Sequence, residues 1–236
     1  MRPDIENFWL ELDPITESIT ETDRELLTAI NTDGNVTLDS FWAMYTDKWT
    51  WIPFVLVIIF CLLYRGDWRR RLLIVASVAL LFVLSDYVVA SFIKNVVCRP
   101  RPSHDPAVMN LLTYVNGYHG GSYGFPSNHA SNGFAAATFL TLLLRSRWAP
   151  VTTFTWAAGS CYSRMYMGVH YPTDILCGSL VGITFAFLVF FIYKRTAKFM
   201  HLAPVNENYS PRVALAIPVT FLLTLAVLLT LSLLIR

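Results

Sequence analysis

Three short polar clusters interrupt an apolar sequence, and their residue types are those that phosphoryl transfer requires. They run from Lys94 to Pro102, from Pro126 to His129 and from Ser163 to Asp174. The side chains of interest are three cations, two histidines and one carboxylate. A phosphoryl group carries its negative charge on three equatorial oxygens, which cations and hydrogen-bond donors stabilise. The clusters therefore point to chemistry on a phosphate ester.

The three cations are suited to holding that phosphate. Lys94, Arg101 and Arg164 can neutralise its oxygens, and each arginine offers two parallel donors. Ser127 and Asn128 precede an apolar run, so they fall where a helix begins. Backbone N–H groups at a helix N-terminus bind anions, so this segment is expected to add donors to the phosphate site.

The third cluster contains a candidate nucleophile. Pro172 suits the first turn of a helix, so a helix is expected to begin near Tyr171, with Asp174 in its first turn. His170 stands four positions before Asp174. A carboxylate that holds one imidazole nitrogen leaves the other nitrogen free to attack phosphorus. His129 can protonate the departing oxygen and later activate water.

Each cluster taken alone also has a purely structural interpretation. Lys94 and Arg101 can be interfacial anchors at a helix end, and His129 a polar residue that opens a helix. Arg164 and Asp174 can simply pair with one another. The functional interpretation needs all three clusters to meet, which depends on how the chain crosses the membrane.

Composition and apolar runs indicate an integral membrane protein. The chain has 236 residues, of which 55% are hydrophobic and 14% are charged, whereas soluble domains average about 25% charged residues. The predicted fold class is all-α, a membrane helical bundle with six transmembrane helices. The predicted spans are 49–65, 72–93, 129–144, 149–167, 173–193 and 213–235. No basic stripe on a soluble face suggests a nucleic-acid partner, and the sequence leaves the oligomeric state open.

The short basic loops predict the direction of these spans. Cations cluster between spans one and two, between three and four, and between five and six, at Arg65, Arg69, Arg70, Arg71, Arg145, Arg147, Lys194, Arg195, Lys198 and Arg212. Alternating spans place these loops on one side, which the positive-inside rule assigns to the cytoplasm. The three polar clusters then share the outer face. We expect a bacterial cytoplasmic membrane protein whose active site faces the extracytoplasmic side.

The N-terminal segment differs in charge from the rest of the chain. Residues 1–48 hold eleven Asp and Glu against three Lys and Arg. Apolar residues at helical spacing predict one or two helices, with a turn at Asp33–Asn35. We expect them to lie at the outer membrane interface. The predicted division is therefore 1–48 as acidic interfacial helices and 49–236 as the six-span domain.

The clusters, in order and spacing, resemble the type 2 phosphatidic acid phosphatase (PAP2) superfamily. The matching pattern is Lys94-x6-Arg101-Pro102, Pro126-Ser127-Asn128-His129 and Ser163-Arg164-x5-His170-x3-Asp174, within a core of about 85–195. The resemblance implies that Lys94, Arg101, Ser127 and Arg164 bind phosphate. It also implies that His170 forms a phosphohistidine oriented by Asp174, that His129 is the acid, and that no metal or cofactor takes part.

One position departs from the family pattern, and three polar residues receive no catalytic role. Asn128 stands where the family commonly has Gly; Asn tolerates positive φ best after Gly, so the loop shape is expected to survive. Its side chain is expected to affect substrate preference.

His104 and His119 match no metal-ligand spacing and are interpreted as loop residues. Asp86 is expected to face the bundle interior with a polar partner.

The resemblance implies hydrolysis of a lipid phosphomonoester or diphosphate. Undecaprenyl diphosphate is the first substrate it suggests, then lipid A, phosphatidic acid or phosphatidylglycerophosphate. A phosphotransferase would use the same site. Vanadium haloperoxidases share the histidine pattern but are soluble, which the six apolar runs oppose. A transporter or scaffold with a degenerate site would lack a motif residue, and every motif residue is present.

Overall fold

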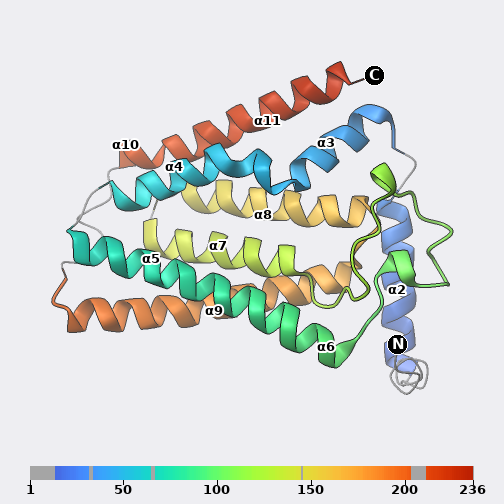
Figure 1. Cartoon of the computed structure of the whole chain (residues 1–236), viewed down its shortest axis with the longest axis horizontal. Helices are drawn as coiled ribbons and strands as arrows, with labels where there is room; N and C mark the ends of the chain where they lie inside the picture. The colour runs from blue at the N-terminus through green and yellow to red at the C-terminus, as the bar shows by residue number, and fades with distance from the viewer. Residues whose placement is uncertain (1–13, 32–33, 65–66, 145, 203–210, 236) are drawn as a thin grey trace.

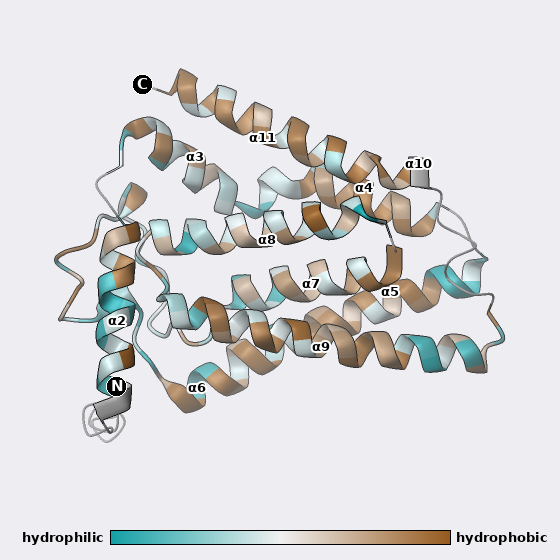
Figure 2. Cartoon of the chain, turned by 180° about the vertical axis from the view of Figure 1, so that it is seen from behind, coloured by the Kyte–Doolittle hydropathy of each residue, from teal (hydrophilic) through white to brown (hydrophobic). Residues whose placement is uncertain are grey.

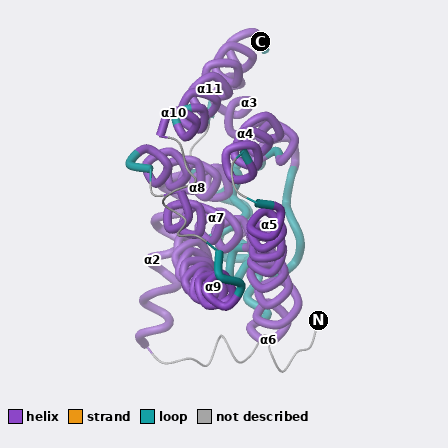
Figure 3. Tube along the Cα trace, turned by 90° about the vertical axis from the view of Figure 1, so that its left-hand side faces the viewer, coloured by secondary structure: helices purple, strands orange, loops and turns teal. Residues whose placement is uncertain are grey.

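The fold was taken from a computed structural model of the chain. The structure describes residues 14–31, 34–64, 67–144, 146–202 and 211–235. Throughout these ranges the regular structure is helical, apart from an isolated bridge between Pro100 and Tyr123. Figure 3 shows helices joined by loops. The prediction of an all-α fold is confirmed. Arg65, Arg145 and Asp33, which entered the topology and turn predictions, lie outside the described residues.

Long helices run side by side and form the bundle (Figure 1). They are α4 (Ile52–Leu63), α5 (Trp68–Phe82) continued by η2 (Val83–Ile93) and α6 (Lys94–Val97), α7 (Asn128–Leu144), α8 (Trp148–Tyr166), α9 (Pro172–Phe199) and α11 (Ala216–Leu234). Each coincides with one predicted apolar span. The segment η2 is a π-helix, a form that occurs frequently at functional sites.

Three of these helices are long and apolar enough to cross a membrane: Trp68–Val97, Pro172–Phe199 and Ala216–Leu234. A fourth candidate is the pair Val36–Thr46 and Lys48–Leu63, bent by 66°. The described chain is therefore that of a multi-pass membrane protein, while the six-span topology stays a prediction. Helices α7 and α8 are not among these candidates: α7 has 17 residues, and both helices are rich in Ala, Ser, Thr and Gly. Small residues are typical of helix–helix interfaces in membranes.

Side-chain caps and prolines fix where several helices begin. The Asn35 side chain accepts a hydrogen bond from Leu38 N at 2.9 Å and starts α3 (Val36–Thr46). Asp67 does the same for α5 through Arg70 N, also at 2.9 Å. Such caps satisfy N–H groups that the first helical turn leaves unpaired. The α9 helix has Pro172 in its first turn, as predicted.

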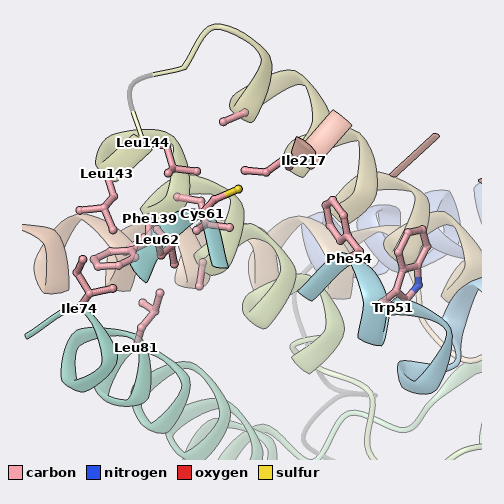
Figure 4. Close-up of a cluster of buried hydrophobic side chains, with 14 of the residues drawn as sticks. Trp51, Phe54, Cys61, Leu62, Ile74, Leu81, Phe139, Leu143, Leu144 and Ile217 are labelled. Carbon is pink, nitrogen blue, oxygen red and sulfur yellow. The ribbon is translucent and has the colours of Figure 1, made fainter. Parts of the chain in front are cut away.

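The core lies where α4, α5, α7, α9 and α11 meet. Figure 4 shows buried side chains from several of these helices pointing toward one another, among them Phe54, Ile74, Phe139 and Ile217. Outward-facing positions are apolar as well, which gives the brown helix surfaces of Figure 2. Because lipid is the solvent for those faces, exposed leucines and phenylalanines there need no cover.

One end of the bundle gathers the predicted chemistry. The end of α6, the start of α7, the end of α8 and the start of α9 lie there with the loop 98–127, and α2 (Pro14–Ile30) crosses this end (Figure 1). The two helices α2 and α3 occupy the N-terminal segment, whose interfacial depth stays a prediction. At the opposite end, hydrophilic residues mark the start of α5 and the end of α9 (Figure 2).

Helices α7 and α9 approach so closely that glycine is required between them. A Cβ at Gly178 would lie 2.5 Å from the backbone oxygen of Ser127, and one at Gly182 would overlap the backbone oxygen of Ser131. The two helices therefore pack backbone against backbone along the segment that leads to the polar end. This contact fixes the second and third clusters relative to one another.

We expect Gly182→Ala to destabilise the protein by about 1–3 kcal/mol, because the added methyl group forces α7 and α9 apart. The thermal unfolding midpoint in detergent checks this. Gly121→Ala is the matched control, since a Cβ there meets nothing within 4 Å. Equal midpoints for the two variants would contradict the close packing of α7 on α9.

Candidate active site

His170 is held in the short connection between α8 and α9. Gly168, at φ +67°, turns the chain after α8, and Val169 N donates to the backbone oxygen of Arg164 at 3.1 Å. The side chain of His170 is 1% exposed. Asp174 lies in the first turn of α9, where its Oδ2 accepts the Tyr171 N–H at 3.0 Å. The predicted helix start and the place of Asp174 are as the sequence indicated.

The hydrogen bonds of His170 define its tautomer. Nδ1 lies 3.2 Å from Asp174 Oδ2, and Nε2 lies 2.9 Å from Arg101 Nη1. A guanidinium only donates, so Nε2 must be the unprotonated nitrogen and Nδ1 carries the proton toward Asp174. The lone pair on Nε2 therefore faces the cations, where a phosphate would bind.

The surroundings of His170 keep it neutral. Burial lowers the pKa of the imidazole well below its ordinary value, and the positive charges of Arg101, Arg164 and Lys94 lower it further. A neutral imidazole has a free electron pair for attack on phosphorus, whereas a protonated one has none. Burial and the same positive charges that would attract a phosphate thus keep His170 in the form that can act as a nucleophile.

The two predicted arginines have donors without partners. Arg101 donates to the backbone oxygen of Val169 at 2.9 Å, and its Nε is buried with no hydrogen-bond partner among the described residues. Arg164 Nε is buried and unpartnered in the same way. Leaving such a donor unpaired costs about 1–3 kcal/mol, which an anionic ligand would recover. Burial and the charge of Arg164 also lower the pKa of Arg101.

Arg164 does not pair with Asp174, so the structural alternative for this arginine is wrong. Its Nη1 donates to Thr46 Oγ1 at 3.1 Å, and its Nη2 donates to Tyr118 OH at 3.3 Å. The guanidinium also lies over the Tyr118 ring, 5.2 Å from the centroid. These contacts orient Arg164 and leave its charge uncompensated by any carboxylate of the described chain.

Lys94 and His129 complete the group around His170. Both exert an electrostatic effect on His170, and the three predicted cations act on His129. His129 stands in the first turn of α7 with an exposed side chain. It makes no hydrogen bond within the described protein, and its imidazole is therefore free to reach a leaving group.

Ser127 and Asn128 are used differently from what the sequence suggested. The Ser127 N–H already donates to the backbone oxygen of Asp174 at 3.0 Å, so it is not available to phosphate. The residue is fully buried. Asn128 is helical, so the positive φ considered for this position is not needed. Its Nδ2 donates to Asp86 Oδ1 at 2.9 Å rather than toward His170.

Sequence reasoning missed Arg99, which links the carboxylate of Asp174 to the N-terminal segment. Its Nη1 donates to Asp174 Oδ1 at 3.1 Å, and its Nη2 to Asp23 Oδ2 at 2.7 Å. The Asp23 carboxylate on α2 also accepts the Thr173 N–H at 3.0 Å. Arg99 stands within the six unspecified positions of the first motif, so the motif gave no signal for it.

Helix α2 docks on this end of the bundle along a single stripe. Asp23, Leu27 and Asn31 recur at one-turn spacing, and all three are buried. Asn31 Nδ2 donates to the backbone oxygen of Tyr166 at 2.6 Å, and its Oδ1 accepts the Thr113 N–H at 2.7 Å. The acidic segment is thus packed against the residues that carry the chemistry.

The remaining polar residues lie outside the group around His170. His104 and His119 are exposed loop residues; His104 contacts Ser103 at 3.0 Å, and His119 packs on Tyr114 at a centroid distance of 4.2 Å. Asp86 has polar partners as expected, but its side chain is exposed rather than enclosed in the bundle.

Comparison with known proteins identifies the family. The family model described as the PAP2 superfamily matches residues 71–198, which contain all three clusters. The chain belongs to the PAP2 superfamily. A lipid A 4'-phosphatase of Bacteroides thetaiotaomicron is 36% identical over 80% of this chain and 85% of its own. One from Porphyromonas gingivalis is 35% identical over 75% of each chain.

A solved structure agrees with the PAP2 fold. The transmembrane PAP2-type phosphatidylglycerolphosphate phosphatase of Bacillus subtilis superposes with a TM-score of 0.59 at 19% identity, over 81% of this chain and 95% of that one. At that identity the likeness concerns the fold alone. The family match and the lipid-phosphatase relatives confirm the sequence prediction of a PAP2 lipid phosphatase.

Asp23→Asn is expected to lower kcat about tenfold, because a weaker Arg99 contact loosens Asp174 and hence His170. KM should change little, since Asp23 does not reach the phosphate site. Steady-state kinetics on a lipid phosphate measure both. Glu25→Gln, an exposed carboxylate on the same helix, is the control. An unchanged kcat would mean that α2 serves stability only.

The pH profile should show the lowered pKa of His170. An ordinary histidine is half protonated near pH 6.5. Because the folded protein lowers this pKa, we expect the acid limb of kcat/KM, which reports protonation of His170, to have its midpoint below pH 6.5. The profile must be corrected for the second ionisation of the substrate phosphate, about pH 6. A corrected midpoint at or above 6.5 would contradict the assignment.

Proposed function

We propose that this PAP2 phosphatase hydrolyses the 4'-phosphate of lipid A or of a closely similar glycolipid. The observation that carries the proposal is the similarity to two lipid A 4'-phosphatases over at least three quarters of the chain. Sequence reasoning placed undecaprenyl diphosphate first and lipid A second. The relatives favour the opposite order.

The proposed reaction begins with attack by His170. Its Nε2 electron pair forms a bond to phosphorus while the bond from phosphorus to the sugar oxygen breaks. His129 gives its proton to that oxygen, so the alcohol leaves neutral. Asp174 holds the Nδ1 proton and stabilises the charge that appears on the imidazole. Lys94, Arg101 and Arg164 bind the phosphoryl oxygens throughout.

Water completes the cycle. His129, now neutral, takes a proton from water as the water oxygen bonds to phosphorus and the bond to Nε2 breaks. Inorganic phosphate leaves and His170 returns to its starting form. In this mechanism the cations supply the charge stabilisation for which other phosphatases use metal ions, so no metal is assigned.

An apolar groove supports a lipid as the substrate. It has a volume of about 650 Å³ and is lined by apolar and aromatic side chains of α3, α8 and α11, with single contributions from α7 and α9. Tyr162 and Met165 in its wall flank Ser163 and Arg164 in the chain. An acyl chain lying there would leave its headgroup close to the phosphate-binding end.

The membrane placement proposed here follows the sequence prediction. Six spans would cross a bacterial cytoplasmic membrane, with Lys194, Arg195 and Lys198 on the cytoplasmic side. The active site and helices α2 and α3 would then face outward, with α2 lying at the interface over the site. The division into an N-terminal cap of residues 1–48 and a membrane domain of 49–236 belongs to the same proposal.

Purified protein should release phosphate from lipid A in the presence of EDTA, and vanadate should inhibit it. His170→Ala is expected to lower kcat by about 10⁴-fold or more, because the nucleophile is lost. His104→Ala, which removes an exposed histidine outside the site, should retain activity. Turnover that survives in His170→Ala, or that needs added divalent metal, would overturn the mechanism.

A further inference from the structure

A second polar cluster adjoins the phosphate site without belonging to it. Asp86 on η2 accepts hydrogen bonds at its Oδ1 from Asn128 Nδ2 at 2.9 Å and from Asn132 Nδ2 at 3.3 Å. Ser85 donates to Asn132 Oδ1 in turn. The cluster thus joins the π-helical part of one span to the first turns of α7, directly beside His129.

Two acceptor atoms in this cluster remain unused. Asp86 Oδ2 receives no hydrogen bond from the described chain, and its side chain is exposed. Asn128 Oδ1 is buried and has no partner there either. A carboxylate within a membrane span is costly unless it faces protein, water or a ligand, and such residues usually mark function. Both atoms accept hydrogen bonds, so a ligand that binds here must donate them.

The hydrogen bonds place the cluster next to His129. Asp86 binds Asn128, which directly precedes His129 in α7. The charge of Asp86 acts on Lys94 and on His129, although it forms no ion pair with Lys94. His129 protonates the departing oxygen in the proposed reaction, so this is the side of the leaving group.

We propose that Asp86 and Asn128 form a subsite for the hydroxyl groups of the sugar that carries the phosphate. A hydroxyl of that sugar would donate to Asp86 Oδ2 or to Asn128 Oδ1, the two acceptors that receive no hydrogen bond from the described residues. A hydrogen bond to a carboxylate is among the stronger ones available to a neutral headgroup. This inference rests on the proposed function and extends it to the selection of the leaving group.

The charge of Asp86 also determines what the subsite disfavours. The leaving group of a polyprenyl diphosphate is itself a phosphate, and its negative charge would be repelled by the nearby carboxylate. The leaving group of phosphatidic acid is a diacylglycerol, whose position next to the ester oxygen offers no hydroxyl of the sugar kind. Asn128 stands where the family commonly has Gly. Its Oδ1 is one of the two acceptors, and its Nδ2 holds Asp86, which carries the other.

Asp86→Asn tests the subsite with little change of shape. The amide oxygen can still accept from Asn128 and Asn132, while the charge and the second acceptor are lost. We would measure kcat/KM on lipid A bearing a 4'-phosphate, on phosphatidic acid and on undecaprenyl diphosphate in the same detergent. Tyr87→Phe, at the exposed neighbouring position, is the control.

The preference for lipid A over phosphatidic acid should fall about 10- to 100-fold in Asp86→Asn, the effect of losing a hydrogen bond to a charged group. The relative rate on undecaprenyl diphosphate should rise. Each preference is a ratio of two kcat/KM values measured on the same variant. A change in the folded fraction therefore cancels, and so does any effect through Lys94 or His129 that is the same for both substrates. Tyr87→Phe should keep the wild-type ratios.

The outcomes separate this inference from the proposed function. If wild type hydrolyses lipid A and Asp86→Asn slows all three substrates equally, the subsite is wrong and the proposed function stands. If wild type hydrolyses phosphatidic acid or the diphosphate but not lipid A, both are wrong. A selective loss on lipid A supports both.

Discussion

The site depends on one buried carboxylate, that of Asp174. A carboxylate removed from water costs several kcal/mol unless it is paired and hydrogen-bonded, so its partners must be present wherever it is buried. One oxygen receives the Tyr171 N–H and the proton on His170 Nδ1, and the other receives Arg99. Arg99 in turn requires Asp23 on α2. His170, the proposed nucleophile, is thus oriented by a chain of contacts that reaches the N-terminal segment.

Charge is divided unequally across this end of the bundle, and the division explains the chemistry. Arg99 is compensated by two carboxylates, whereas within the described residues the other three cations have none within ion-pair distance: Lys94, Arg101 and Arg164. Burial is the larger cause of the lowered pKa values of Arg101 and His170, and repulsion between like charges held together in this partly dry site lowers both further. A phosphate dianion relieves that repulsion, and the same burial and charges keep His170, the proposed nucleophile, unprotonated.

Sequence patterns predicted those contacts of the site that join residues close together in the chain. His170, Pro172 and Asp174 lie within five positions, so helix geometry alone placed the carboxylate against the imidazole. Alternation of apolar runs brought the clusters to one end. The pairing of Arg99 with Asp23 joins residues 76 positions apart, and no periodicity reveals a partner chosen by tertiary packing. Asn128 was expected to allow the positive φ that suits the Gly common in the family, whereas it opens α7 with a helical backbone.

Rigidity of the site follows from the close approach of α7 and α9 rather than from its loops. Gly178 lets the backbone of α9 touch that of Ser127, and a hydrogen bond of 3.0 Å joins Ser127 N to the Asp174 carbonyl. Ser127, which precedes the turn of α7 that carries His129, is thereby bonded to Asp174, the partner of His170. Catalytic groups placed on packed helices keep their separation better than groups on loops, and a misplacement of 1 Å can lower rates about a hundredfold. In the proposed mechanism the second motif therefore contributes through its backbone, because the Ser127 hydrogen bond holds the start of α7, which carries His129, against the start of α9.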